Sequence, residues 1–90
     1  MYKIEISSKF RRELKTIRKR GYDIDKLDVI VGLLSKGITL PIKNRDHALI
    51  GDNKGFRECH IAPDWLLIYR IEEDRLVLYL LRTGTHSDLF

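Results

Sequence analysis

All three histidines of this chain, His47, His60 and His86, lie in its second half. Histidine exchanges a proton readily near neutrality because its ordinary pKa is about 6.5. Asp64 follows His60 by four residues and could orient an imidazole, stabilise its charge or act as a base itself. The alternative for Asp64 is a turn or cap aspartate. Together these residues suggest one site of acid–base chemistry.

Other kinds of chemistry find less support. Cys59 and His60 are adjacent, so a regular strand points them to opposite faces and prevents a nucleophile–base couple. A small buried thiol is the simpler interpretation of Cys59. Zinc is a minor alternative, because the chain has no tight His-x-x-x-His or Cys-x-x-Cys spacing. We therefore expect neither a metal nor another cofactor.

Size and composition indicate one small domain over residues 1–90. A chain of 90 residues can bury a modest core but not two, and its 43% hydrophobic and 33% charged residues are typical of a soluble globule. The longest uncharged run, 29–35, is far shorter than the roughly 18 residues of a membrane span. The N-terminus lacks the apolar core of a secretory signal, and the lone cysteine forms no internal disulfide. We expect no membrane contact and a cytoplasmic location.

The two halves of the chain carry opposite charge. Residues 1–45 hold 12 Lys and Arg against 5 Asp and Glu, net +7, whereas residues 46–90 hold 5 against 8, net −3. Seven cations fall in one short segment, opposed only by Glu13: Lys9, Arg11, Arg12, Lys15, Arg18, Lys19 and Arg20. Such density attracts a phosphate backbone or an acidic protein, because docking releases counterions. A solvated helix face is the alternative.

The N-terminal half predicts a strand and two helices. Tyr2, Ile4 and Ile6 alternate with polar residues, which is typical of a strand with one buried face. A helix follows from Ser8 as N-cap to Gly21, with Phe10, Leu14 and Ile17 on its apolar side. A second helix runs from Asp25 to Gly37, with an apolar stripe of Leu27, Ile30, Val31 and Leu34.

The C-terminal half predicts the rest of the sheet. Short β-like runs begin near His47, Phe56, Trp65 and Arg75, with turns at 51–55 and 73–74 between them. The runs 65–72 and 75–82 are apolar on both faces, so we expect them to be central strands. The predicted class is α+β: one strand, two helices, then a mainly antiparallel meander with the helices packed on one face.

Two aromatic residues lie beside the candidate site. Trp65 directly follows Asp64 and could be a core residue or a platform for a nucleobase. Phe90 ends a tail that also carries His86, and could anchor this tail or stack on a base. A docked tail would bring His86 to the site on the open face of the sheet.

Three segments carry a family resemblance: Asp46–Gly51, Gly55–Tyr69 and Arg82–Phe90. They resemble the YafQ branch of the RelE-like toxins, within the RelE/ParE superfamily. The resemblance covers nearly all of residues 46–90, whereas the helical half matches only in layout and basic character. It implies the toxin of a type II toxin–antitoxin system, a ribosome-dependent endoribonuclease that cuts messenger RNA. It also implies a cognate antitoxin as partner.

By this resemblance, His47, His60, Asp64 and His86 match catalytic positions, and Trp65 and Phe90 match aromatic positions that assist the site. The implied chemistry is metal-free attack of a ribose 2′-oxygen on the adjacent phosphorus. Our hypothesis gives His60, with Asp64, the base side and His86 the acid side. His47 and Arg82 would stabilise the phosphate. The basic helix would bind ribosomal RNA through Lys9, Arg11, Arg12, Lys15, Arg18 and Lys19.

Two other functions stay open at this point. A non-enzymatic ParE-like toxin shares the architecture but binds a protein target such as a gyrase subunit, and it would not need a histidine cluster. A basic nucleic-acid-binding module would use only its helix, with histidines that merely pack. Replacing all three histidines separates these alternatives from a nuclease, because only the nuclease loses its activity while it remains folded.

Overall fold

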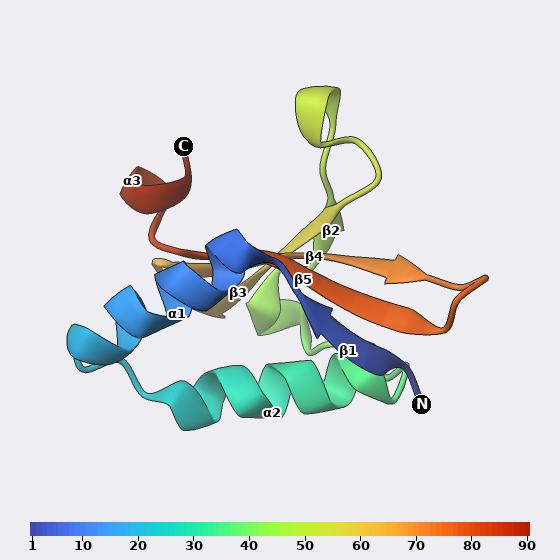
Figure 1. Cartoon of the computed structure of the whole chain (residues 1–90), viewed down its shortest axis with the longest axis horizontal. Helices are drawn as coiled ribbons and strands as arrows, with labels where there is room; N and C mark the ends of the chain where they lie inside the picture. Colours follow the sequence, from blue (N-terminus) through green and yellow to red (C-terminus); the bar gives the residue numbers. More distant parts are fainter.

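Five strands form one twisted sheet (Figure 1). The computed structural model describes residues 1–90, and the sheet order is β1-β5-β4-β3-β2. The strands are β1 (Lys3–Ile6), β2 (His47–Ala48), β3 (Arg57–Ala62), β4 (Trp65–Glu72) and β5 (Val77–Gly84). β1 runs parallel to β5, and the other neighbouring pairs are antiparallel. The predicted α+β class, with β4 and β5 inside a mainly antiparallel sheet, is confirmed.

The two predicted helices are present, but their N-caps lie one and two residues before the expected Ser8 and Asp25. α1 spans Ser8–Lys19, and Ser7 caps it by accepting a hydrogen bond from the backbone N–H of Phe10. α2 spans Ile24–Ser35, and Asp23 caps it. Serine and aspartate side chains stabilise these positions because they satisfy N–H groups that have no partner inside the helix.

The sheet separates two apolar clusters of different size. The larger one joins α1 and α2 to the sheet and includes Phe10, Ile17, Leu27, Trp65 and Tyr69. The smaller one, on the opposite face, holds Leu66, Ile68 and Leu89. Neighbouring β4 residues thus serve different clusters, as expected because side chains alternate along a strand. This alternation explains why residues 65–69 are all buried.

The C-terminal tail forms a third short helix, α3 (His86–Leu89), on the face opposite α2 (Figure 1). The tail docks through Leu89, which is 9% exposed, and not through the alternative anchor Phe90, which is 67% exposed. The two predicted helices, α1 and α2, pack on one face as expected, and α3 is an additional helix on the other face. None of the helices is long and apolar enough to cross a membrane.

Candidate active site

Three sequence-distant residues meet beside one end of the central strands. His60 lies near the end of β3, Asp64 lies in the turn between β3 and β4, and His86 begins α3, separated from the end of β5 by one residue. Because β3, β4 and β5 are neighbours in the sheet, the β3–β4 turn and the start of α3 lie at the same end of these strands. The sheet topology therefore converts separations of up to 26 residues in sequence into direct contact.

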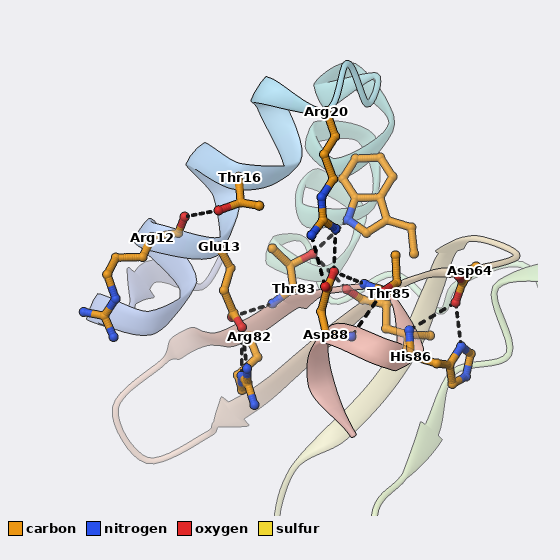
Figure 2. Close-up of polar contacts among 12 residues, drawn as sticks. Arg12, Glu13, Thr16, Arg20, Asp64, Arg82, Thr83, Thr85, His86 and Asp88 are labelled. Atoms are coloured by element: carbon orange, nitrogen blue, oxygen red, sulfur yellow. Dashed lines mark hydrogen bonds and ion pairs between the residues drawn. The ribbon is translucent and has the colours of Figure 1, made fainter.

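Asp64 and His86 form a hydrogen-bonded pair (Figure 2). Asp64 Oδ1 accepts the backbone N–H of His86 at 3.1 Å and lies 2.8 Å from its Nδ1. The side-chain hydrogen bond from His86, and to a smaller extent the one from its backbone N–H, lowers the pKa of Asp64. An ionised Asp64 can only accept, so Nδ1 carries the proton and Nε2 is left for proton exchange with a substrate.

His60 lies next to this pair. Its ring centroid is 5.7 Å from that of His86, with the two planes tilted by 54°. Its Nδ1 lies 3.3 Å from the carbonyl oxygen of Pro63. The expected pairing of Asp64 with His60 is therefore not the observed one, because the β3–β4 turn aims the carboxylate at the tail instead. Two imidazoles at this separation can contact one phosphodiester from different sides.

His47 lies on the edge strand β2 and is engaged by other groups. Its Nδ1 lies 2.6 Å from the carbonyl oxygen of Arg45, and its Nε2 lies 3.5 Å from Glu58 Oε1. Glu58 is buried, and sequence reasoning missed it. The signal was present, since Glu58 precedes His60 by two positions on one strand and therefore shares its face.

A second carboxylate fixes α3 in place. Asp88 caps the helix reciprocally with Thr85, and it accepts two hydrogen bonds from Arg20 at 2.6 and 3.1 Å (Figure 2). The hydrogen bond from Arg20, and to a smaller extent the one from the backbone of Thr85, holds the pKa of Asp88 far below its ordinary range. Gly84 leaves room for this arrangement, because a Cβ there would lie 2.9 Å from that of Asp88. Sequence reasoning placed Arg20 in the basic segment but gave it no role at the site.

The two aromatic candidates lie in different environments. Trp65 is 2% exposed, packs edge-on against Tyr22 with centroids 5.2 Å apart, and donates from Nε1 to Thr83 Oγ1. These contacts favour the core alternative for Trp65, since its ring has no free face for a base. Phe90 is exposed at the end of α3 and remains available to a ligand.

Arg82 is occupied by an acidic partner. Its Nε donates to Glu13 Oε2 at 3.0 Å, and Glu13 also accepts the backbone N–H of Thr83 (Figure 2). The guanidinium lies against Glu13 of α1 and apart from Asp64 and His86. In this arrangement Arg82 ties β5 to α1, and a phosphate would have to compete with Glu13 for it.

The geometry supports neither a nucleophilic role for Cys59 nor a cluster of metal ligands. Cys59 is fully buried among the residues beneath the helices, and burial raises the pKa of its thiol to about 12. It is therefore protonated at neutral pH and unsuited to nucleophilic attack. Nowhere do three or more His, Cys, Asp or Glu side chains gather closely enough to hold a metal ion.

Comparisons with known proteins agree with one another. Residues 2–90 match the family model described as "Bacterial toxin of type II toxin-antitoxin system, YafQ". The mRNA interferase toxin YafQ of Escherichia coli K12 is 41% identical over 88 residues, which cover 97% of this chain and 94% of that protein. Among solved structures, a metal-bound toxin from Helicobacter pylori superposes with a TM-score of 0.94 at 46% identity, over the full length of both chains.

A second solved structure includes a partner protein. The toxin of the Escherichia coli DinJ–YafQ toxin–antitoxin complex superposes with a TM-score of 0.89 at 39% identity, covering 99% of this chain and 97% of that one.

Proposed function

The chain belongs to the YafQ family of bacterial type II toxins, and from that premise we propose that it is an endoribonuclease that cleaves messenger RNA on the ribosome. One structural observation supports this activity above the others. His60, His86 and Asp64 come from three separate segments and converge around one exposed point. A toxin that acted only by binding a protein target would have no need of this arrangement.

The reaction requires a base, an acid and charge stabilisation at phosphorus. We assign the base to His60, because its Nδ1–H can donate to the Pro63 carbonyl and leave Nε2 as an acceptor. His60 takes the 2′-hydroxyl proton while the 2′-oxygen forms a bond to phosphorus. The bond from phosphorus to the 5′-oxygen breaks, and a 2′,3′-cyclic phosphate results.

His86 is the acid in this assignment. Its Nε2 gives a proton to the departing 5′-oxygen, and Asp64 stabilises the protonated imidazole through Nδ1. Asp64 therefore acts with His86 rather than with His60, which revises the pairing expected from sequence. His47 is the remaining candidate to stabilise the phosphate, with Glu58 beside it.

The proposed partners follow from the family and from charge. The solved complex of DinJ with a YafQ toxin supports a cognate antitoxin for this chain. All six α1 cations expected to bind rRNA are exposed: Lys9, Arg11, Arg12, Lys15, Arg18 and Lys19. We propose that they bind ribosomal RNA, which positions messenger RNA at the histidines, so free RNA is cut poorly.

The test is cleavage of a defined messenger RNA on purified ribosomes by the wild-type protein and by His60→Ala and His86→Ala. We expect each variant to lose roughly 10²- to 10⁴-fold in kcat, the usual contribution of one general acid or base. Ser87→Ala is the matched control, since Ser87 lies beside His86 on α3 and is exposed. Mass spectrometry of the products should find a 2′,3′-cyclic phosphate or 3′-phosphate and a 5′-hydroxyl.

Two results would reject the proposal. Full activity in a folded His60→Ala, His86→Ala double variant would favour a binding toxin or a nucleic-acid-binding module. Loss of wild-type cleavage in a chelator selective for transition metals, at a Mg²⁺ concentration that keeps ribosomes intact, with recovery on adding back a transition-metal ion, would replace the metal-free mechanism.

A further inference from the structure

A cavity of about 650 Å³ opens next to His60. Its walls come from α2, from the 3-10 turn Ile42–Asn44 with Arg45, and from the end of β3. This volume lies within the roughly 300–1,000 Å³ typical of ligand pockets. His60 is part of the wall, but its ring lies beside His86 on the face of the sheet opposite α2. The cavity and the proposed site of cleavage therefore share this residue across the end of β3, and a substrate that reaches both must pass around that end.

The cavity is strongly cationic. Lys26, Lys43 and Arg45 line it, and no Asp or Glu does. All three are exposed, and none takes part in an ion pair, although the arginines of residues 46–90 do. Three unpaired cations around one concave surface favour an anionic occupant.

The inner surface of the cavity is apolar. Ile30, Leu33 and Ile61 contribute to it, and Val29 lies at its rim with 62% of its surface exposed. An inorganic anion would gain nothing from these side chains. A nucleotide fits both halves of the lining, since its phosphate can meet the cations while its base covers apolar surface.

The turn that forms one wall also contacts both neighbouring histidine segments. Asn44 is 4% exposed and donates from Nδ2 to the carbonyl oxygen of His60 at 2.7 Å, while its Oδ1 has no hydrogen-bond partner. Arg45 adopts a left-handed conformation, with φ of 49°, and its carbonyl oxygen faces His47 Nδ1. A buried acceptor without a donor and a strained non-glycine residue are features that gather at binding sites.

We propose that this cavity binds the nucleotide that flanks the scissile phosphate in the RNA substrate. Lys26, Lys43 and Arg45 hold its phosphate, and the apolar wall with Asn44 receives its base. The inference rests on the proposed ribonuclease function and deepens it, since it locates substrate recognition on this chain rather than on the ribosome alone. An acidic antitoxin segment is the competing occupant, but it would have no need of a base-sized cavity that shares His60.

The experiment compares Lys26→Gln, Lys43→Gln with the matched control Lys3→Gln, Lys54→Gln, which removes the same charge from exposed lysines elsewhere. Arg45 is left intact because its backbone faces His47. With messenger RNA programmed on ribosomes, we expect the cavity variant to fall about tenfold in kcat/KM, mostly through KM, because it can no longer form charged hydrogen bonds to phosphate. The slope of log affinity against log salt should also decrease by about one for each lysine replaced.

A photocrosslink locates the base directly. Messenger RNA carrying 4-thiouridine on either side of the cleavage point is irradiated with the His86→Ala protein on ribosomes, and the crosslinked peptides are identified. Crosslinks to residues 41–45 or 60–63 support the proposal. Crosslinks elsewhere, with the cavity variant as active as its control, overturn it.

Two further outcomes separate the remaining possibilities. If the cavity variant cleaves normally but loses affinity for the antitoxin, the cavity belongs to the antitoxin and the proposal is wrong. If the wild-type protein cuts no programmed messenger RNA, the ribonuclease function itself has failed, and this inference fails with it.

Discussion

At the scale of single residues, Asp64 determines how His86 presents itself. One oxygen of Asp64 accepts from both the backbone and the ring of His86, so it fixes the orientation of the imidazole as well as its tautomer. Both side chains are more than half exposed, at 66% and 56%, so the pair stands at the surface. The Asp64–His86 pair therefore positions the imidazole of His86 and adds little to the stability of the fold.

Asp64→Asn tests this role. The amide oxygen can still accept from His86, but the negative charge that stabilises the protonated imidazole is gone. We expect kcat on ribosomes to fall roughly 10²- to 10⁴-fold with little change in KM or melting temperature. Asp52→Asn, in the exposed 51–55 loop, is the control. An unchanged kcat would assign Asp64 a purely structural part.

Tyr69 anchors the segment that carries His47. Its hydroxyl donates to Asp46, and Arg57 donates two hydrogen bonds to the same carboxylate. Burial, followed by the hydrogen bond to Asp46, raises the pKa of Tyr69. The neutral phenol is therefore the form that the fold stabilises. Asp46 directly precedes His47, so this network fixes the start of β2.

Tyr69→Phe should destabilise the protein by about 1 kcal/mol in urea denaturation at neutral pH, the usual effect of losing one such hydrogen bond. Because the pKa of Tyr69 is raised in the fold, the stability that its hydrogen bond provides is complete below the ordinary tyrosine pKa near 10. This stability is lost as pH rises through the folded pKa. Tyr79→Phe is the control, since no hydrogen bond of its hydroxyl is present. Equal stability of the two variants would contradict the role of Tyr69.

At the scale of elements, α3 is too short to hold itself in place. A helix of four residues is unstable alone, so its position depends on Leu89 and on the Arg20–Asp88 pair. This pair also links the end of α1, the basic helix, to the element that carries His86. Positioning of the proposed acid therefore depends on a residue 66 positions away in sequence.

Arg20→Gln should loosen the docking of α3 and remove the pH dependence of that docking. The pKa of Asp88 is lowered in the fold, so the stability that ionised Asp88 gives to the docked α3 is complete above the ordinary carboxylate pKa near 4. That stability is lost as pH falls through the folded pKa. In NMR titrations, the Leu89 methyl signals of the wild type should thus change below about pH 4. In the variant they should resemble the undocked state already at neutral pH. Arg18→Gln is the control, and docked signals in Arg20→Gln would contradict the prediction.

Elements were more predictable than contacts. Alternation and helical spacing predicted β1, α1, α2 and the later strands, because these patterns follow from local geometry. They could not show that Ile4 and Ile6 remain 45% and 37% exposed, since burial depends on how far the helices extend over an edge strand. The sequence left Phe90 open as an anchor for the tail or as a stacking residue, because the direction in which a short helix turns is a tertiary property.

The site was predictable to a similar degree. Residue types indicated acid–base chemistry at His60, Asp64 and His86, and the sheet order brings these residues together. The partner of Asp64 and the engagement of Arg82 by Glu13 depend on side-chain directions in turns and between layers. The spacing of residues along the sequence does not predict which residue pairs with Asp64 or that Arg82 binds Glu13. The cavity beside His60 likewise exists only once α2 packs against the end of β3.

At the scale of the whole molecule, exposed cations gather on α1 and around the cavity next to His60. The only acidic residue of α1, Glu13, turns inward to Arg82 and Thr83, which leaves the outer side of that helix with cations alone. On another side, Lys26, Lys43 and Arg45 line the cavity next to His60. In the proposed function, the N-terminal half therefore attracts the polyanion and the C-terminal half carries out the proton transfer.

Charge reversal on α1 tests whether this attraction acts on the ribosome. We expect Arg11→Glu, Arg12→Glu, Lys15→Glu to weaken ribosome binding by at least tenfold and to reduce the salt slope of log affinity by about one for each phosphate that is no longer bound. All three side chains are exposed, so folding should be unaffected. The control reverses Lys3, Lys36 and Lys54, which are equally exposed but lie outside α1 and outside the cavity. Affinity and salt slope are measured by sedimentation with ribosomes over a range of salt concentrations. If both variants weaken equally, only net charge matters and α1 makes no specific interaction; if neither weakens, the toxin approaches the ribosome through another surface.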